Sequence, residues 1–220
     1  TLELKNFLNN NKAKIISSIA MFYDLENPIS FAKSIKENLH EDGIWHFEQS
    51  YMPSMLRTNS YDTICHEHLE YYSLRNIIDI LSKSNLKVVN VQLNDINGGS
   101  FAVTATHINS NKFSENNAYI NWLLNEEDKM KIGTIHPLKK FKDRVIAHRE
   151  SLKDLIYKLK NDGKKIFGYG ASTKGNILLQ YCDFSSDEID YIAEVNSEKF
   201  GCFTPGTNIP IISEDEAKKM

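Results

Sequence analysis

Residues 86–107 read LKVVNVQLNDINGGSFAVTATH, two β-rich runs joined by turn-forming residues. The runs, Leu86 to Leu93 and Phe101 to His107, are rich in the β-branched and aromatic residues typical of strands. The connection contains Asn97-Gly98-Gly99, which suits a tight reversal of the chain. The segment therefore predicts an antiparallel hairpin, and the elements before it determine which kind of sheet the hairpin joins.

Upstream of the hairpin, apolar runs alternate with segments of helical periodicity. In order, we predict a short helix over 2–10, a strand over 15–22 buried on both faces, a helix from Pro28 to His40, a turn at 41–43, a strand over 44–47 and a helix over 73–84 with Ser73 as its N-cap. Strands that alternate with helices form parallel sheets. The expected fold class is therefore α/β, with one antiparallel strand added by the hairpin.

A second unit is predicted after the hairpin. Residues 113–160 have the apolar spacing of two helices, and Asn161-Asp162-Gly163 is a helix stop signal. We therefore expect three parts, residues 1–112, 113–160 and 161–220. The last part begins with a strand over 164–167, a Gly-rich turn and a helix over 176–181.

A strand, a Gly-rich turn and a helix in this order can direct backbone N–H groups at a phosphate. The candidate contacts in this turn are Gly168, Gly170, Lys174 and Gly175. Glu194, near the end of a predicted strand over 189–195, is a further candidate. The third glycine is not at the spacing of the full dinucleotide fingerprint, so tight packing without a ligand is the alternative.

Composition excludes several classes of function. The 220 residues are 41% hydrophobic and 25% charged, with a net charge of −3. Such a chain is typical of a globular protein and favours neither a nucleic-acid nor a membrane partner. Its three widely spaced cysteines predict no disulfide framework and a reducing cytoplasm.

Residues 61–73, YDTICHEHLEYYS, concentrate groups that transfer protons. His66, Glu67 and His68 are consecutive and follow Cys65. Two alternatives remain open: a metal site, since Cys and His bind zinc, and a loop in which the histidines only satisfy backbone groups. Tyr23 is expected at the carboxyl end of a parallel strand, where α/β sheets bind ligands. The hairpin turn, through Asn97, Gly98 and Ser100, could offer backbone N–H groups beside it.

Five segments carry a resemblance to a known family. They are IAMFYDLENP (19–28), GIWHFEQSYMPSMLRTNSYDTICHEHLEYYSL (43–74), NDINGGSFAVT (94–104), GYGASTKGN (168–176) and AEVNSEKFGCFTPGTNIPI (193–211), with YDTICHEHLEYYS contained in the second. Together they resemble sugar C-methyltransferases, class I enzymes that act on nucleotide-linked keto-deoxysugars. The resemblance implies the second half of a class I methyltransferase Rossmann-like sheet, a helical connection and a partial C-terminal Rossmann-like domain.

The resemblance also implies a reaction and roles for particular residues. A base removes the proton at C3 of a 4-keto sugar, and the enolate takes a methyl group from S-adenosylmethionine. The family motif assigns the base to His68, with Glu67 orienting it, His66 close by and Tyr23 near the transferred methyl group. Cys65 stands where relatives often have tyrosine. The turn residues named above would bind the nucleotide-sugar, a deoxythymidine diphosphate type.

The same resemblance predicts that the chain is incomplete at both ends. It starts at what corresponds to the fourth strand, so most of the S-adenosylmethionine site and the family's structural zinc domain are expected outside it. The edge of the sheet would then be covered by the remaining strands or by another chain. A non-catalytic nucleotide-sugar-binding α/β protein and an interaction domain with a metal-stapled loop are the alternative functions.

Overall fold

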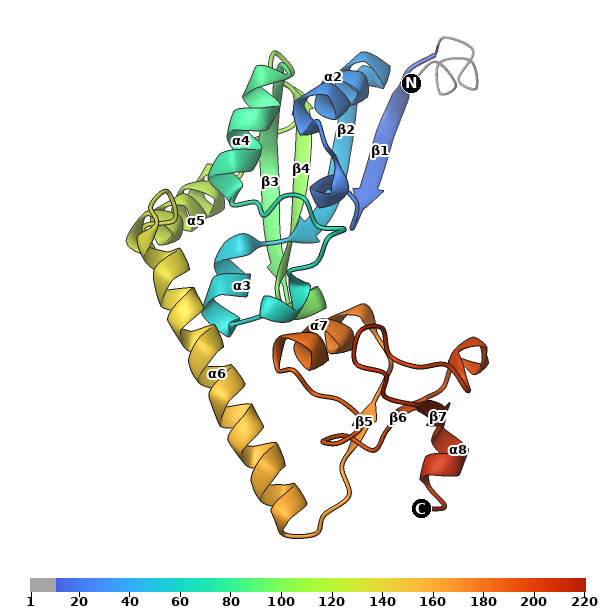
Figure 1. Cartoon of the computed structure of the whole chain (residues 1–220). Helices are drawn as coiled ribbons and strands as arrows, with labels where there is room; N and C mark the ends of the chain where they lie inside the picture. The colour runs from blue at the N-terminus through green and yellow to red at the C-terminus, as the bar shows by residue number, and fades with distance from the viewer. Residues whose placement is uncertain (1–10) are drawn as a thin grey trace. The chain divides into compact units, whose positions relative to one another are not determined.

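The computed structural model describes residues 11–220, so the helix predicted over 2–10 lies outside the described residues. The chain forms two compact units (Figure 1). The first contains the described residues up to 60 and residues 66–139. The second contains residues 61–65 and 140–220.

The first unit is built on a four-stranded sheet in the order β1-β2-β4-β3. The strands are β1 (Ala13–Ile19), β2 (Leu39–Ser50), β3 (Leu86–Asn94) and β4 (Ser100–His107). β1 and β2 are parallel, whereas β4 is antiparallel to both β2 and β3. The predicted hairpin and its antiparallel last strand are therefore confirmed, and β4 is inserted between β2 and β3. This is the strand arrangement of the second half of a class I methyltransferase sheet.

Within residues 11–130, the helices that accompany this sheet are α2 (Pro28–Asn38), α3 (Met52–Thr58), α4 (Leu74–Lys83) and α5 (Asn117–Lys129). α2 and α4 contact each other and lie against one face of the sheet (Figure 1). Local sequence fixes where they begin. Asn27 accepts a hydrogen bond from the Ser30 N–H at the start of α2, and Ser73 forms a capping box with Asn76 at the start of α4.

The core of this unit is aromatic at its centre. The Phe22 ring packs against Trp45 and Phe47, with ring centroids 5.5 and 5.4 Å away, and against Tyr72 at 5.5 Å. Trp45 and Phe47 are fully buried. Phe22 belongs to a short 3-10 helix, η1 (Phe22–Asp24), so this core holds the segment after β1 against β2.

Three predictions for this region were wrong in detail. β1 ends at Ile19, because Ala20 adopts a positive φ of 52°, and Phe22 to Asp24 form η1 rather than strand. β1 is also not buried on both faces among the described residues, since Ile15 and Ile19 are 69% and 56% exposed. Residues 41–43 lie inside β2 rather than in a turn, with an irregular register opposite Ala13 and Ile15.

A buried carboxylate joins three elements of the first unit. Glu127 of α5 is 1% exposed and accepts hydrogen bonds from the Tyr51 hydroxyl at 2.7 Å and from the Leu74 N–H at 2.6 Å. The Arg75 N–H donates to its other oxygen at 3.2 Å. The charge therefore lies at the N-terminus of α4, where the helix dipole stabilises it. Burial is the largest cause of a raised pKa for the Tyr51 hydroxyl, and the Glu127 carboxylate raises this pKa further.

The second unit contains a three-stranded parallel sheet in the order β5-β6-β7. Its elements are α6 (His136–Asn161), which begins in the first unit, β5 (Phe167–Tyr169), α7 (Thr173–Tyr181), β6 (Tyr191–Glu194), η4 (Ser197–Lys199), β7 (Ile211–Ser213) and α8 (Glu214–Ala217). The segment η2 (Tyr61–Thr63) belongs here because the Tyr61 hydroxyl bonds His148 Nδ1 at 3.0 Å and its ring packs on Tyr181.

The turn between β3 and β4 is packed closely against α3. It contains η3 (Ile96–Gly98), and Gly99 follows with a φ of 122°. A Cβ atom on Gly99 would lie 2.5 Å from the Ser54 Cβ. Only glycine therefore fits at this position, both for backbone conformation and for space.

We expect Gly99→Ala to lower the free energy of unfolding by about 2–4 kcal/mol, from backbone strain and overpacking together. Gly133→Ala is the matched control, because its Cβ would have no atom within 4 Å. That variant should stay within about 0.5 kcal/mol of the parent. Urea unfolding of both variants measures the difference, and equal stabilities would refute the packing argument.

Candidate functional site

The candidate site of the first unit lies where β1 and β2 end. Tyr23 follows β1 in η1 and is 9% exposed. Its ring contacts His68 with a centroid distance of 4.4 Å. Its carbonyl accepts hydrogen bonds from the Leu69 and Glu70 N–H groups at 3.0 and 3.1 Å. The backbone thus holds the His-Glu-His segment against the turn after β1.

The three consecutive polar residues differ in exposure. His68 is half-buried, whereas His66 and Glu67 are exposed. A half-buried imidazole packed on an aromatic ring has a restricted orientation, as a base that must meet one particular proton requires. Of the predicted catalytic residues, the structure brings Tyr23 and His68 into contact.

Sequence reasoning missed one carboxylate at this point. Asp24 follows Tyr23 directly, and its charge interacts with both His68 and Glu67. Burial raises the pKa of Asp24, His68 opposes that rise, and Glu67 adds to it. The signal in the sequence is that Asp24 directly follows Tyr23, a predicted site residue. Only the fold shows that η1 and the His-Glu-His segment meet.

The hairpin turn and the His-Glu-His segment are both attached to the residues that follow β2. The Tyr51 N–H donates to the Gly99 carbonyl at 3.0 Å, and the Met52 N–H donates to the Tyr72 carbonyl at 2.9 Å. Asn97 and Gly98 have positive φ angles of 55° and 85°. The Ser100 hydroxyl donates to the Ile96 carbonyl at 3.0 Å. Substrate binding by Asn97, Gly98 and Ser100 stays a prediction, and Ser100 has a structural partner already.

The Gly-rich turn of the second unit connects β5 to α7. Gly168 lies in β5, where a Cβ would be 2.4 Å from Ile192 Cδ1, so this glycine serves sheet packing. Gly170 has a φ of 88° and open space around its Cβ position. Ser172 caps α7 by accepting from the Gly175 N–H at 3.1 Å. Lys174 lies in the first turn of α7. The Gly170 N–H donates to the Ala193 carbonyl at 2.8 Å and so belongs to the sheet, and phosphate binding by this turn stays a prediction.

Glu194 supports this turn from beneath. It is 7% exposed and accepts hydrogen bonds from the N–H groups of Ala171 at 2.8 Å, Val195 at 2.8 Å and Asn196 at 3.0 Å. The hydrogen bonds from the N–H groups of Asn196, Ala171 and Val195, named with the largest effect first, lower the pKa of Glu194 from an ordinary 4.5 to about 2. Both carboxylate oxygens are thus committed to backbone N–H groups. Direct binding of a nucleotide-sugar by Glu194 stays a prediction.

Two further expectations from the sequence concern Cys65 and a bound metal ion. Cys65 is half-buried, and all three cysteines are free thiols. Within residues 11–220, no three His, Cys, Asp or Glu side chains are grouped so that they could hold a metal ion. None of the helices in this range is long and apolar enough to cross a membrane.

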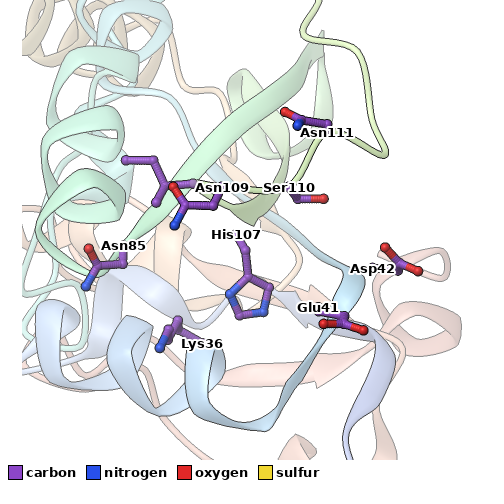
Figure 2. A pocket seen from close by; sticks show the side chains of 9 residues that line it. Lys36, Glu41, Asp42, Asn85, His107, Asn109, Ser110 and Asn111 are labelled. Carbon is purple, nitrogen blue, oxygen red and sulfur yellow. The ribbon is translucent and has the colours of Figure 1, made fainter.

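A polar depression of about 510 Å³ lies at the opposite end of the first sheet, where β2 begins and β4 ends (Figure 2). His107 lies at its centre, and its Nε2 is 3.1 Å from the Leu39 carbonyl. The other lining residues are Lys36, Glu41, Asp42, Asn85, Ile108, Asn109, Ser110 and Asn111. No residue of the predicted site lines this depression, so it is separate from the proton-transfer segment.

Comparison with known families agrees with the fold. Residues 95–220 match the family described as the C-methyltransferase C-terminal domain, and residues 3–91 match a methyltransferase domain family. Because the first match covers more than half of the chain, the chain belongs to the C-methyltransferase family. It is similar to C-methyltransferase NovU of Streptomyces niveus, with 34% identity over 179 residues. That alignment covers 81% of this chain and 42% of NovU, so the chain spans less than half of that relative.

Solved structures are more distant. A structure titled as a pericyclic reaction enzyme aligns with a TM-score of 0.38 and 10% identity, over 44% of this chain and 27% of that one. A methyltransferase in complex with its activator Trm112 from Haloferax volcanii aligns with the same TM-score and 11% identity, over 44% of this chain and 55% of that one. Likenesses at this level carry no argument about function.

The depressed pKa of Glu194 predicts how stability depends on pH. A carboxylate whose pKa is about 2 in the folded state and near 4.5 when unfolded stabilises the fold above pH 4.5. That contribution is lost as the pH falls from 4.5 towards 2. We expect Glu194→Gln to flatten the pH dependence of the unfolding midpoint in this window. Asp187→Asn, at an exposed carboxylate of the same unit, is the control. An unchanged slope in Glu194→Gln would contradict the assignment.

Proposed function

We propose that the intact protein transfers a methyl group from S-adenosylmethionine to a carbon of a nucleotide-linked keto sugar. Membership of the C-methyltransferase family supports methyl transfer to carbon, and the relative NovU is itself named a C-methyltransferase. The observation that carries the proposal is the contact between Tyr23 and the half-buried His68 at the carboxyl end of the sheet. A positioned imidazole at this edge is suited to removing a proton from carbon.

The proposed chemistry begins next to a carbonyl group. A 4-keto group acidifies the C–H bond at C3, because the electrons of that bond can move into the carbonyl to give an enolate. His68 accepts the proton and becomes an imidazolium. C3 then forms a bond to the methyl carbon as the bond between that carbon and sulfur breaks. S-adenosylmethionine supplies the electrophilic methyl group.

Asp24 has a defined part in this proposal. The imidazolium that His68 becomes is positively charged, and Asp24 is a carboxylate whose charge interacts with that ring. The carboxylate therefore stabilises the product of the proton transfer. Glu67 lies one residue from His68 and also interacts with Asp24. We assign the charge-stabilising role to Asp24 and keep Glu67 as an orienting residue.

The second unit provides the proposed nucleotide site. The N-terminus of α7 and the side chain of Lys174 suit a diphosphate. Glu194 positions the turn by holding the Ala171 N–H. A deoxythymidine-type nucleotide is a proposal from the resemblance to sugar C-methyltransferases, as is a cytoplasmic location from the three free cysteines.

In this proposal, residues 11–220 contain the groups for proton transfer but not the whole S-adenosylmethionine site. Class I methyltransferases hold S-adenosylmethionine with a Gly-rich loop after a strand. Among residues 11–139 the glycines are Gly43, Gly98, Gly99 and Gly133, and none of these follows the end of β1 or β2 as such a loop would. We therefore assign the binding of S-adenosylmethionine to none of the described residues.

His68→Ala tests the proposed base. In the intact protein with a nucleotide-linked 4-keto sugar in deuterium oxide, exchange at C3 should slow by about 10²–10⁴-fold. His136→Ala is the control, because His136 is exposed and remote in sequence from the site. Exchange is followed by proton NMR. An unchanged rate in His68→Ala would exclude His68 as the base, and binding of the sugar without any exchange in the parent would favour a non-catalytic binding protein.

Asp24→Asn tests the carboxylate beside the base. The exchange rate should fall by about fivefold, because a charge pair that is open to solvent contributes at most about 1 kcal/mol. High salt should reduce the difference between parent and variant. Glu26→Gln removes a nearby exposed carboxylate and is the matched control. A loss in the control as large as that in Asp24→Asn would show that only the general negative potential matters.

A further inference from the structure

His68 lies in a short loop that is held at both ends. After the loop, the Leu69 N–H donates a hydrogen bond to the Tyr23 carbonyl at 3.0 Å. Before the loop comes η2, which belongs to the second unit and is mostly buried. Only residues 64–68 separate these two attachment points in the sequence. The chain that carries the proposed base is therefore anchored once in each unit.

Tyr61 provides the attachment of η2. It is 6% exposed, and its hydroxyl bonds Nδ1 of His148 in α6 at 3.0 Å. Its ring packs on Tyr181, the last residue of α7, with a centroid distance of 5.4 Å. Burial is the largest cause of a raised pKa for the Tyr61 hydroxyl, and the Cys182 thiol raises this pKa further, so the phenol stays neutral. Ring packing and a directional hydrogen bond together fix the orientation of η2 on α6 and α7.

The ring against which Tyr61 packs is itself held in place. The guanidinium carbon of Arg149 lies 5.4 Å from the centroid of the Tyr181 ring, within the range of cation–π contacts. Arg149 also forms an ion pair with Asp183, and Lys153 Nζ lies 3.7 Å from the same carboxylate. Charged side chains of α6 therefore fix the C-terminal end of α7.

The helix α7 connects this attachment to the proposed diphosphate site. The diphosphate is proposed at the N-terminus of α7, whereas Tyr61 packs at its last residue. A helix of 9 residues is a rigid element, because each turn is hydrogen-bonded to the next. The anchor of the His68 loop and the proposed nucleotide site therefore share one rigid element.

We propose that Tyr61 is a positioning residue for the proton transfer. By holding η2 on α6 and α7, it restricts residues 64–68 to conformations in which the His68 imidazole meets the C3–H bond. A short loop with one end released gains many conformations, and a base displaced by about 1 Å loses much of its effect. Tyr61 acts through the chain and not by contact with the substrate. This inference rests on the proposed function and extends it, because it makes the base of the first unit depend on the second.

Tyr61→Phe tests the proposal, because it keeps the ring and removes only the hydroxyl. In the intact protein with a nucleotide-linked 4-keto sugar in deuterium oxide, the maximal rate of exchange at C3 should fall about 10-fold. The KM of the exchange should stay within about twofold of the parent value, because no contact with the substrate is lost. Tyr157→Phe, at an exposed tyrosine of α6, is the matched control and should change neither quantity. Proton NMR follows the exchange.

A second measurement separates positioning from general stability. In Tyr61→Phe, amide hydrogen exchange followed by mass spectrometry should become faster in residues 61–70 and stay at the parent rate in the strands of both units. The unfolding midpoint should fall by no more than about 4 °C, the loss expected for one hydrogen bond. Tyr61→Ala removes the ring as well, so its maximal rate should fall further, by about 100-fold, at the same KM.

Each outcome supports or overturns the inference. A lower maximal rate at constant KM, with faster amide exchange confined to residues 61–70, supports it. An unchanged maximal rate in both Tyr61 variants would overturn it. Faster amide exchange throughout both units would also overturn it, because the lost activity would then follow from general destabilisation. If the parent bound the sugar nucleotide without exchange at C3, the proposed function would fail and this inference with it, whereas a failure of the Tyr61 variants alone leaves that function standing.

Discussion

The buried carboxylate of Glu127 is the constraint on which the first unit depends. It binds the hydroxyl of Tyr51, just after β2, and the first backbone N–H groups of α4. The His-Glu-His segment (His66–His68) lies between these two attachment points in the sequence. The Tyr72 carbonyl, which follows the segment, accepts a hydrogen bond from the Met52 N–H. One charge at a helix N-terminus therefore fixes both ends of the segment. Because an unpaired buried charge is costly, loss of either partner would disturb the segment before it disturbed the sheet.

The position of β4 has a comparable effect on the site. β4 lies between β2 and β3, so the turn that precedes it is brought next to the residues that follow β2. Gly99 allows this close approach, and its carbonyl accepts a bond from Tyr51. The site of the first unit is thus formed by three connecting segments at the carboxyl end of β1 and β2, the usual position of ligand sites in α/β proteins.

The two units contribute different chemistry. The first has the half-buried imidazole of His68 near the end of β1, with the carboxylate of Asp24 beside it. The second has the N-terminus of α7, preceded by a turn whose Ala171 N–H is held by Glu194. Groups suited to proton transfer are therefore separate in sequence from groups suited to phosphate.

The sequence alone determined the hairpin, the helix caps at Asn27 and Ser73 and the Gly-rich turn, since each depends on residues a few positions apart. It also determined which residues could carry proton transfer, through their side-chain chemistry. Only the tertiary structure decided that Asp24 accompanies His68, that Glu194 is used by backbone N–H groups and that Tyr61 is bonded to His148. These relations join residues 23 to 87 positions apart. Strand pairing and packing create them, and no local pattern in the sequence records them.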